Sequence, residues 1–226
     1  MKKKYYLFNL NINFMNILAF VILIALWILT INIKGGEFFL NSLTTTTFIL
    51  YIVIMITHEL LHGFSYYIHG GEKDKIVFGA ALEKGILYCL CKQNISRKNI
   101  LWSSMYPLIF IGVITYIIGL IFNLPILAML SMLNLSGCGG DICTFLYISR
   151  LNKNIEFSET DDPTVFAIYA DYDVSKVKHI GLKYKEDAET IERNDLTKIK
   201  ISKPSKIIFI VLIIIIIMNI LMECLI

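Results

Sequence analysis

Residues 46–68 read TTFILYIVIMITHELLHGFSYYI, an apolar stretch that contains an H-E-x-x-H motif. A helix of this length rises about 1.5 Å per residue and can cross the roughly 30 Å of hydrocarbon in a bilayer. Histidine and glutamate side chains are costly to keep in a membrane, so their presence in such a segment indicates a functional site. The stretch therefore predicts both a membrane-spanning helix and the place where the chemistry occurs.

The motif His58-Glu59-Leu60-Leu61-His62 combines two imidazoles with a carboxylate. Positions i and i+4 of a helix share one face, so His58 and His62 can bind a single metal ion. Glu59 can hold a water molecule beside that ion and act as its general base. Two nitrogen ligands, a base and an open coordination position are typical of zinc hydrolases, so we expect a Zn2+ cofactor.

The composition of the whole chain indicates an integral membrane protein of mainly α fold. Of its 226 residues, 56% are hydrophobic, and the mean hydropathy is +0.67. Five apolar stretches are long enough to span a bilayer. We expect these helices at residues 14–33, 46–68, 100–122, 125–148 and 206–226, within a single domain that covers residues 1–226.

The basic residues predict the orientation of these helices. If the N-terminus is cytoplasmic, five spans place the C-terminus outside, and all 21 Lys and Arg residues except Lys34 then fall on the cytoplasmic side. We therefore expect a multi-pass protein of the cell membrane that has the lipid bilayer as a partner. The net charge of +3 follows from this sidedness and gives no indication of nucleic-acid binding.

Two excursions on the cytoplasmic side are expected, at residues 69–99 and 150–205. The first contains β-prone runs at residues 76–80 and 86–90, which predict a small hairpin against the membrane. The second contains a β-prone run at residues 165–169 and a charged stretch at residues 183–200, which we expect to be helical or partly ordered. This second excursion is too short to bury a sizeable core alone.

A catalytic zinc ion usually has three protein ligands, so the motif leaves one ligand to find. Asp141 is the only carboxylate of the third and fourth spans. It lies about 14 Å of helix rise from Arg150, and His58 lies about 18 Å from Gly70, so both should lie in the cytoplasmic half of the membrane. The glycines beside Asp141 would allow close helix approach or local unwinding. We expect Asp141 to be the third ligand; alternatively, it pairs with Arg150 near the membrane surface.

Other polar residues are weaker candidates for the metal site. His69 would lie about 16 Å along the helix from His58, which indicates a helix-end residue. Cys138 and Cys143 could bind zinc as thiolates, although cysteines in membrane helices more often serve packing. Asn134, on the same helix face as Asp141, could donate a hydrogen bond to substrate or to the Asp141 carboxylate. The remaining carboxylates would need loops that fold inward, or lie at the opposite membrane face: Glu83, Glu156, Glu159 and Glu223.

Over roughly residues 45–170 the chain resembles the DUF3267 family of bacterial zincin peptidases. The matching elements are His58–Gly63, Phe78-Gly79, Tyr88-Cys89, Pro107 and the Asn134–Asp141 segment. More distantly, the chain is similar to the site-2 proteases, which pair an H-E-x-x-H helix with an Asp on a later helix. The resemblance implies a zinc ion held by His58, His62 and Asp141, with Glu59 as the base.

We therefore expect an intramembrane zinc metallopeptidase that hydrolyses peptide bonds of membrane-embedded or membrane-associated polypeptides. In this interpretation Glu59 takes the proton of the attacking water. The alternative is a non-catalytic metal-binding scaffold or regulator, in which a fourth protein ligand such as Cys138 would close the site. Glu59 favours the enzyme, because a structural zinc ion needs no base.

Overall fold

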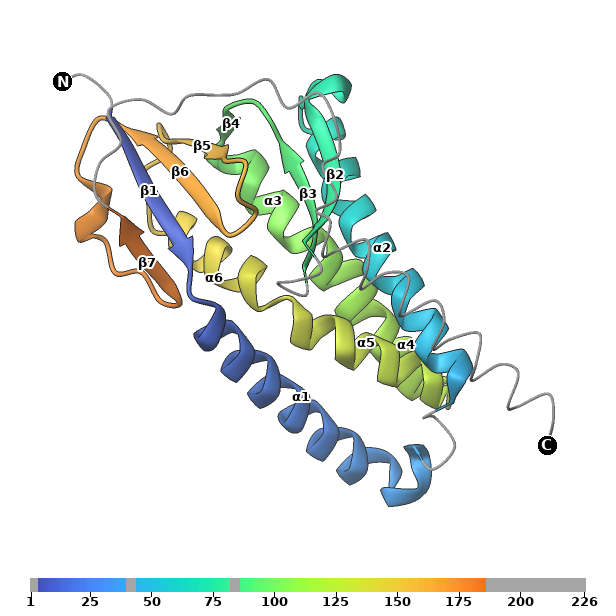
Figure 1. The fold of residues 1–226 in the computed structure, drawn as a ribbon. Coiled ribbons are helices and arrows are strands. Elements are labelled where there is room, and N and C mark those ends of the chain that lie inside the picture. Colours follow the sequence, from blue (N-terminus) through green and yellow to red (C-terminus); the bar gives the residue numbers. More distant parts are fainter. Residues whose placement is uncertain (1–3, 40–43, 82–85, 186–226) are drawn as a thin grey trace.

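The structure is a computed structural model that describes residues 4–39, 44–81 and 86–185 (Figure 1). Its helical elements are α1 (Ile12–Lys34), α2 (Thr45–Ile68), α3 (Arg97–Pro107), the π-helical segment η4 (Leu108–Ile114), α4 (Thr115–Ile121), α5 (Pro125–Gly137) and α6 (Gly139–Ile148). Its strands are β1 (Lys4–Leu10), β2 (Ile76–Ala81), β3 (Ile86–Cys91), β4 (Ile95–Ser96), β5 (Glu156–Glu159), β6 (Val165–Ala170) and β7 (Leu182–Lys185). The mainly α fold with small sheets is confirmed.

Local sequence signals set the ends of these helices. The Thr44 side chain caps α2 by accepting a 3.2 Å hydrogen bond from the Thr47 N–H, and Ser96 caps α3 in the same way. Pro125 is the first residue of α5. The N–H at this position makes no hydrogen bond within a helix, so the missing N–H of proline removes none. Asn123 turns the chain between α4 and α5 with a positive φ of 52°. Helices α4 and α5 are therefore joined by a tight turn.

Three helical stretches are long and apolar enough to cross a membrane: α1, α2 and the run from Arg97 to Ile121. Helices α5 and α6 pass the same test only as a pair, and they are bent by 49°. The span expected at residues 125–148 is thus a broken helix, with Cys138 between its two halves, next to the glycines for which local unwinding was one of the two expectations. The fifth expected span, residues 206–226, lies outside the described residues, so the five-span topology and its orientation stay predictions.

The outer surfaces of these helices carry large exposed apolar side chains, including Phe20, Ile28, Val53 and Ile56. Such a surface is unusual in a soluble protein but is expected of helices that face lipid. This property is consistent with location in a membrane.

An antiparallel five-stranded sheet lies at one end of the helices, with strand order β4-β5-β6-β1-β7 (Figure 1). The N-terminal strand β1 pairs with both β6 and β7, so that Phe8 lies opposite Phe166 and Tyr184. The second excursion is therefore completed by a strand from the start of the chain, which lies between β6 and β7. The β-prone run at residues 165–169 is confirmed within β6.

The expectation of helical or partly ordered structure at residues 183–200 is wrong for Lys183–Lys185. These residues belong to β7, because their backbone pairs with Leu7–Asn9 of β1. The remaining residues of that stretch lie outside the described part of the chain.

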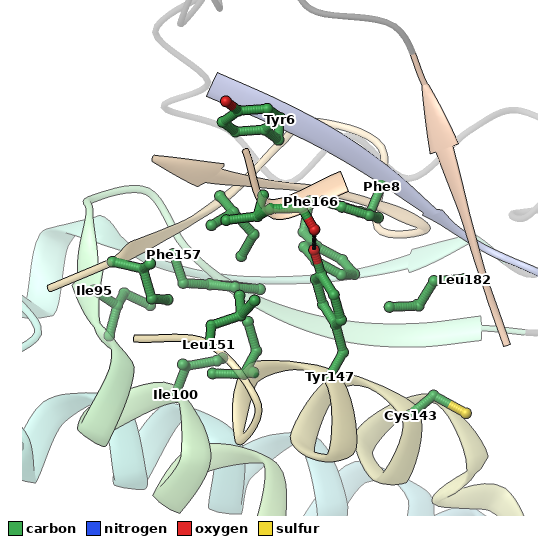
Figure 2. Packing of buried hydrophobic residues seen from close by; sticks show 14 of the residues in the cluster. Tyr6, Phe8, Ile95, Ile100, Cys143, Tyr147, Leu151, Phe157, Phe166 and Leu182 are labelled. Atoms are coloured by element: carbon green, nitrogen blue, oxygen red, sulfur yellow. Dashed lines mark hydrogen bonds between the residues drawn. The ribbon is translucent and has the colours of Figure 1, made fainter. Parts of the chain in front are cut away.

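The sheet packs on α6 through a buried aromatic and aliphatic core (Figure 2). Tyr147 of α6 points into the sheet, where its ring centroid lies 4.7 Å from that of Phe8. Its hydroxyl donates a 2.8 Å hydrogen bond to the Val174 carbonyl. Arg97 donates to the Ile148 and Ser149 carbonyls at the C-terminal end of α6, where a cation also complements the helix dipole. These contacts fix α6 between the sheet and α3.

The expected hairpin is confirmed as β2 and β3, which run alongside α2 (Figure 1). The hairpin approaches α2 at Gly63, where an added Cβ would lie 2.4 Å from the end of the Phe78 ring. Within the hairpin, the Tyr88 ring covers Gly79 so closely that a Cβ there would lie 2.3 Å from it. The pieces His62-Gly63, Phe78-Gly79 and Tyr88-Cys89 are therefore one packing unit, which holds β3 beside the H-E-x-x-H motif.

Candidate metal centre

The structure brings His58, His62 and Asp141 together, and within its described residues they are the group of His, Cys, Asp or Glu side chains suited to hold a metal ion. His58 and His62 lie one turn apart on α2, and their Nε2 atoms are 3.2 Å apart. Asp141 lies in the first turn of α6, directly after the bend. Its Oδ2 lies 3.4 Å from His58 Nε2, and its Oδ1 lies 3.3 Å from His62 Nε2.

These separations allow the three side chains to share one zinc ion. Zinc binds imidazole nitrogen and carboxylate oxygen at about 2.0–2.1 Å, so two ligand atoms at tetrahedral corners lie about 3.3–3.4 Å apart. The two histidine nitrogens are 3.2 Å apart, and each lies 3.3–3.4 Å from a different oxygen of the Asp141 carboxylate. One ligand atom from each side chain lies within 4.8 Å of the other two, so the group is close enough to hold one ion.

The hydrogen bonds of the two imidazoles turn their metal-binding nitrogens toward Asp141. His62 Nδ1 lies 3.0 Å from the Ser103 carbonyl oxygen, which can only accept, so Nδ1 carries the proton. His58 Nδ1 lies 2.9 Å from Asn134 Oδ1. The orientation of that amide is set by its Nδ2, which donates to the Pro107 carbonyl at 3.3 Å. Each neutral imidazole therefore presents an Nε2 lone pair, as zinc-binding histidines do.

Three acceptor groups consequently converge on one point. Two Nε2 lone pairs and a carboxylate repel one another unless a cation lies between them, and a zinc ion supplies that charge. The donor set, its spacing and its tautomers all fit zinc.

Glu59 lines the same cavity as the three ligand side chains, so the expected general base lies at the site without being part of the ligand group. The backbone N–H of Cys89 in β3 hydrogen-bonds to its carboxylate. This contact depends on the close packing of β3 on α2 at Gly63. The hairpin thus holds the carboxylate in place beside the ligands.

The cavity in front of the ligands has a volume of about 380 Å³. Its walls come from α1, α2, β3, the α5–α6 bend and β5. Pockets that bind small molecules typically measure about 300–1,000 Å³. The cavity is therefore large enough to hold a short segment of polypeptide next to the ligands.

Asn134 is buried and lies beside the site. Its Oδ1 accepts from His58, and its Nδ2 donates to Pro107. Both polar atoms of the amide therefore have partners within the chain. The predicted hydrogen bond from Asn134 to substrate stays a prediction.

The other candidate residues are not members of the ligand group, although Cys138 contacts His58. His69 caps the end of α2 and stacks on Trp102, with 6.3 Å between the ring centroids. Cys138 is buried at the bend, where its Sγ donates to the Asn134 carbonyl at 3.2 Å. Arg150 donates to the Lys178 carbonyl at 3.0 Å, whereas Asp141 contacts the two histidines. Cys143 is buried, Glu156 accepts from Asn94, and Glu83 and Glu223 lie outside the described residues.

Glu159 of β5 lines the cavity, although sequence reasoning placed it in a loop away from the site. The Tyr66 hydroxyl donates to its Oε1 at 2.9 Å, and the Cys91 backbone N–H donates to its Oε2. Burial raises the pKa of Glu159 from 4.5 to about 7. The sequence offered one indication of the surroundings of Glu159, namely its partner Tyr66. Tyr66 follows His62 by four residues, so it lies on the same face of α2 as His62.

This raised pKa predicts a pH-dependent stability. Between pH 4.5 and about 7 the unfolded chain releases the Glu159 proton while the folded chain keeps it. Stability should therefore fall as the pH rises through that window and level off above it. We expect the thermal midpoint of the metal-free protein in detergent to fall more steeply with pH than that of Glu159→Gln. Parallel curves would contradict this prediction, and Glu156→Gln should behave like the wild type.

Comparison with known proteins gives one match. Residues 51–155 match the model of the DUF3267 family, whose description reads "Putative zincin peptidase". No curated protein and no solved structure matches the chain significantly. The matched range contains the candidate metal group of His58, His62 and Asp141, together with Glu59, the β2–β3 hairpin and the α5–α6 bend, whereas Glu159 lies beyond it. The part of the chain that carries the metal centre is thus a match to the DUF3267 family, which confirms the resemblance seen in its sequence.

Proposed function

We propose that the protein is a zinc-dependent peptidase whose active site lies within the membrane. The observation that carries this proposal is the convergence of His58, His62 and Asp141 within reach of one metal ion, with Glu59 in the same cavity. The match of this region to a family described as zincin peptidases supports the same function. A carboxylate beside such a ligand group has a use in hydrolysis and none in a purely structural zinc site.

In the proposed mechanism, His58, His62 and Asp141 would hold a zinc ion, which would supply the Lewis acidity that polarises a peptide carbonyl and lowers the pKa of a water molecule toward about 7. Glu59 accepts the proton of that water as it attacks the carbonyl carbon. The same carboxyl group then gives the proton to the amine nitrogen as the C–N bond breaks. The Cys89 N–H keeps Glu59 directed into the cavity through both steps.

We further propose that the substrate is a membrane-embedded or membrane-associated polypeptide. The cavity that leads to the ligands is lined by Met15, Asn16 and Ala19 of α1 and by residues of α2. Both helices are long and apolar enough to cross a membrane. A polypeptide that reaches the ligands would therefore pass between elements that themselves meet lipid.

The proposed orientation places the N-terminus in the cytoplasm and the C-terminus outside. Lys34, the one basic residue expected outside, donates to Asn123 at 2.7 Å at the end of the helices that lies opposite the five-stranded sheet (Figure 1). The sheet, which includes β1 and β7, then lies on the cytoplasmic side. Water and polar substrate segments would reach the ligands from that side.

The direct test combines metal analysis with a cleavage assay on the purified full-length chain in liposomes. We expect one zinc ion per chain and cleavage of membrane-tethered fluorescent peptides. Treatment with a zinc chelator should stop cleavage, and added zinc should restore it. One bound zinc ion without cleavage of any tethered peptide would favour the scaffold or regulator, in which Cys138 is the nearest candidate for a fourth ligand.

A further inference from the structure

Two backbone carbonyls of α3, four residues apart, are connected to the two histidines of the metal centre. The Ser103 carbonyl accepts from His62 Nδ1 at 3.0 Å. The Pro107 carbonyl accepts from Asn134 Nδ2 at 3.3 Å, and Asn134 Oδ1 lies 2.9 Å from His58 Nδ1. Both imidazoles are thus oriented, directly or through one amide, by the same turn of α3.

The Ser103 carbonyl can accept from His62 because of the residue that follows it by four positions. In an α-helix, the carbonyl of residue 103 accepts from the N–H of residue 107. Pro107 has no N–H, so that helical bond cannot form. Ser103 and Pro107 are both fully buried, so water does not replace the missing donor. The imidazole of His62 satisfies a buried acceptor that the proline leaves free.

The Pro107 carbonyl also lies where the regular helix is interrupted. Helix α3 ends at Pro107, and the π-helical segment η4 begins at the next residue. In a π-helix each hydrogen bond joins residues five apart, whereas in an α-helix it joins residues four apart. The pattern of backbone hydrogen bonds therefore changes at this point. The carbonyl at the junction accepts from the Asn134 side chain, and this contact sets which amide atom faces His58.

We propose that Pro107 is a positioning residue for the metal centre. By removing one helical donor it gives His62 a fixed acceptor, and through its own carbonyl it orients Asn134 and hence His58. Both Nε2 lone pairs are then directed at Asp141 before any metal binds. This inference rests on the metal-binding part of the proposed function and does not depend on peptide hydrolysis.

Replacing Pro107 by Ala should weaken zinc binding without weakening the fold. The new N–H at position 107 would compete for the Ser103 carbonyl, and His62 would lose its fixed orientation. Loss of such a partner of a metal-bound histidine typically costs about 10–100-fold in metal affinity. The thermal midpoint of the metal-free variant should stay equal or rise, because alanine suits a helix interior better than proline does.

The measurement is a zinc titration of the full-length protein in detergent against a chromophoric chelator, together with the absorption spectrum of the cobalt-loaded protein. Pro125→Ala is the matched control, since Pro125 lies at the first turn of α5, where no helical donor is missing. Its zinc affinity and cobalt spectrum should equal those of the wild type.

A second pair of variants tests the path through Asn134. Asn134→Ala removes the acceptor of the His58 N–H and should also weaken zinc binding, whereas Asn134→Asp keeps an acceptor and should retain more affinity.

Wild-type affinity and spectrum in Pro107→Ala would overturn the proposal. So would a fall in the metal-free thermal midpoint, because Pro107 would then serve the fold. A protein that shows the expected affinities but cleaves no peptide would leave this inference standing and refute the proposed peptidase activity.

Discussion

Replacing Glu59 by Gln should abolish peptide hydrolysis while one zinc ion per chain remains bound. The amide has nearly the same size as the carboxylate and can still occupy the cavity beside the ligands. It cannot accept a proton from water or return one to the leaving amine. General base and acid catalysis of this kind contributes about 10²–10⁴-fold to the rate, so the residual rate should be close to background.

The measurement pairs turnover of a membrane-tethered peptide with metal analysis of the same preparation. Glu72→Gln is a suitable control, because Glu72 is exposed in the loop after α2. That variant should keep both wild-type turnover and zinc content. Wild-type turnover in Glu59→Gln would refute the mechanism, and loss of zinc in that variant would show that Glu59 is itself a ligand.

Replacing Asp141 by Ala should remove most of the bound zinc. The change leaves two imidazoles as the only ligands from this group, and catalytic zinc usually requires three protein ligands. The loss of affinity should exceed the roughly 10–100-fold expected for a residue that only orients a ligand. Zinc content after dialysis against a weak chelator measures the effect.

Two further variants make the result for Asp141 specific. Asp171→Ala alters an exposed carboxylate of the loop after β6 and should bind zinc as the wild type does. Cys138→Ala should likewise keep its zinc, because Cys138 is not part of the ligand group. Full zinc content in Asp141→Ala would place the third ligand elsewhere, and loss of zinc in Cys138→Ala would favour a closed structural site.

The ligand group could be found from the sequence because local geometry determines most of it. Residues four apart on a helix always share a face, so the pairing of His58 with His62 required no knowledge of the fold. Asp141 could be identified as the candidate third ligand because no other carboxylate occurs in the third or fourth expected span. The β2–β3 hairpin could be predicted for the same reason, because its two β-prone runs are close together in the sequence.

Features that depend on distant contacts were not predictable in the same way. Residues 125–148 have the composition of one span, and the glycines beside Asp141 indicate only that the helix could unwind there, whereas the structure shows a 49° bend between α5 and α6. Glu159 reaches the cavity from β5, whose sheet also contains β1 from the start of the chain and β4 from the end of the first excursion. The function of Pro107 depends on which side chain meets the Ser103 carbonyl across the helix interface.

The position of β1 in the sheet has a consequence for the order of folding. Its partner strand β6 is synthesised after helices α1 to α6, so β1 must wait for most of the domain before it can pair. Contacts between such distant segments form slowly, because a long loop must close first. The strand continues almost directly into α1, which forms one wall of the cavity. That wall should therefore become fixed late in biogenesis, so the nascent protein would bring His58, His62 and Asp141 together before it encloses the cavity in front of them.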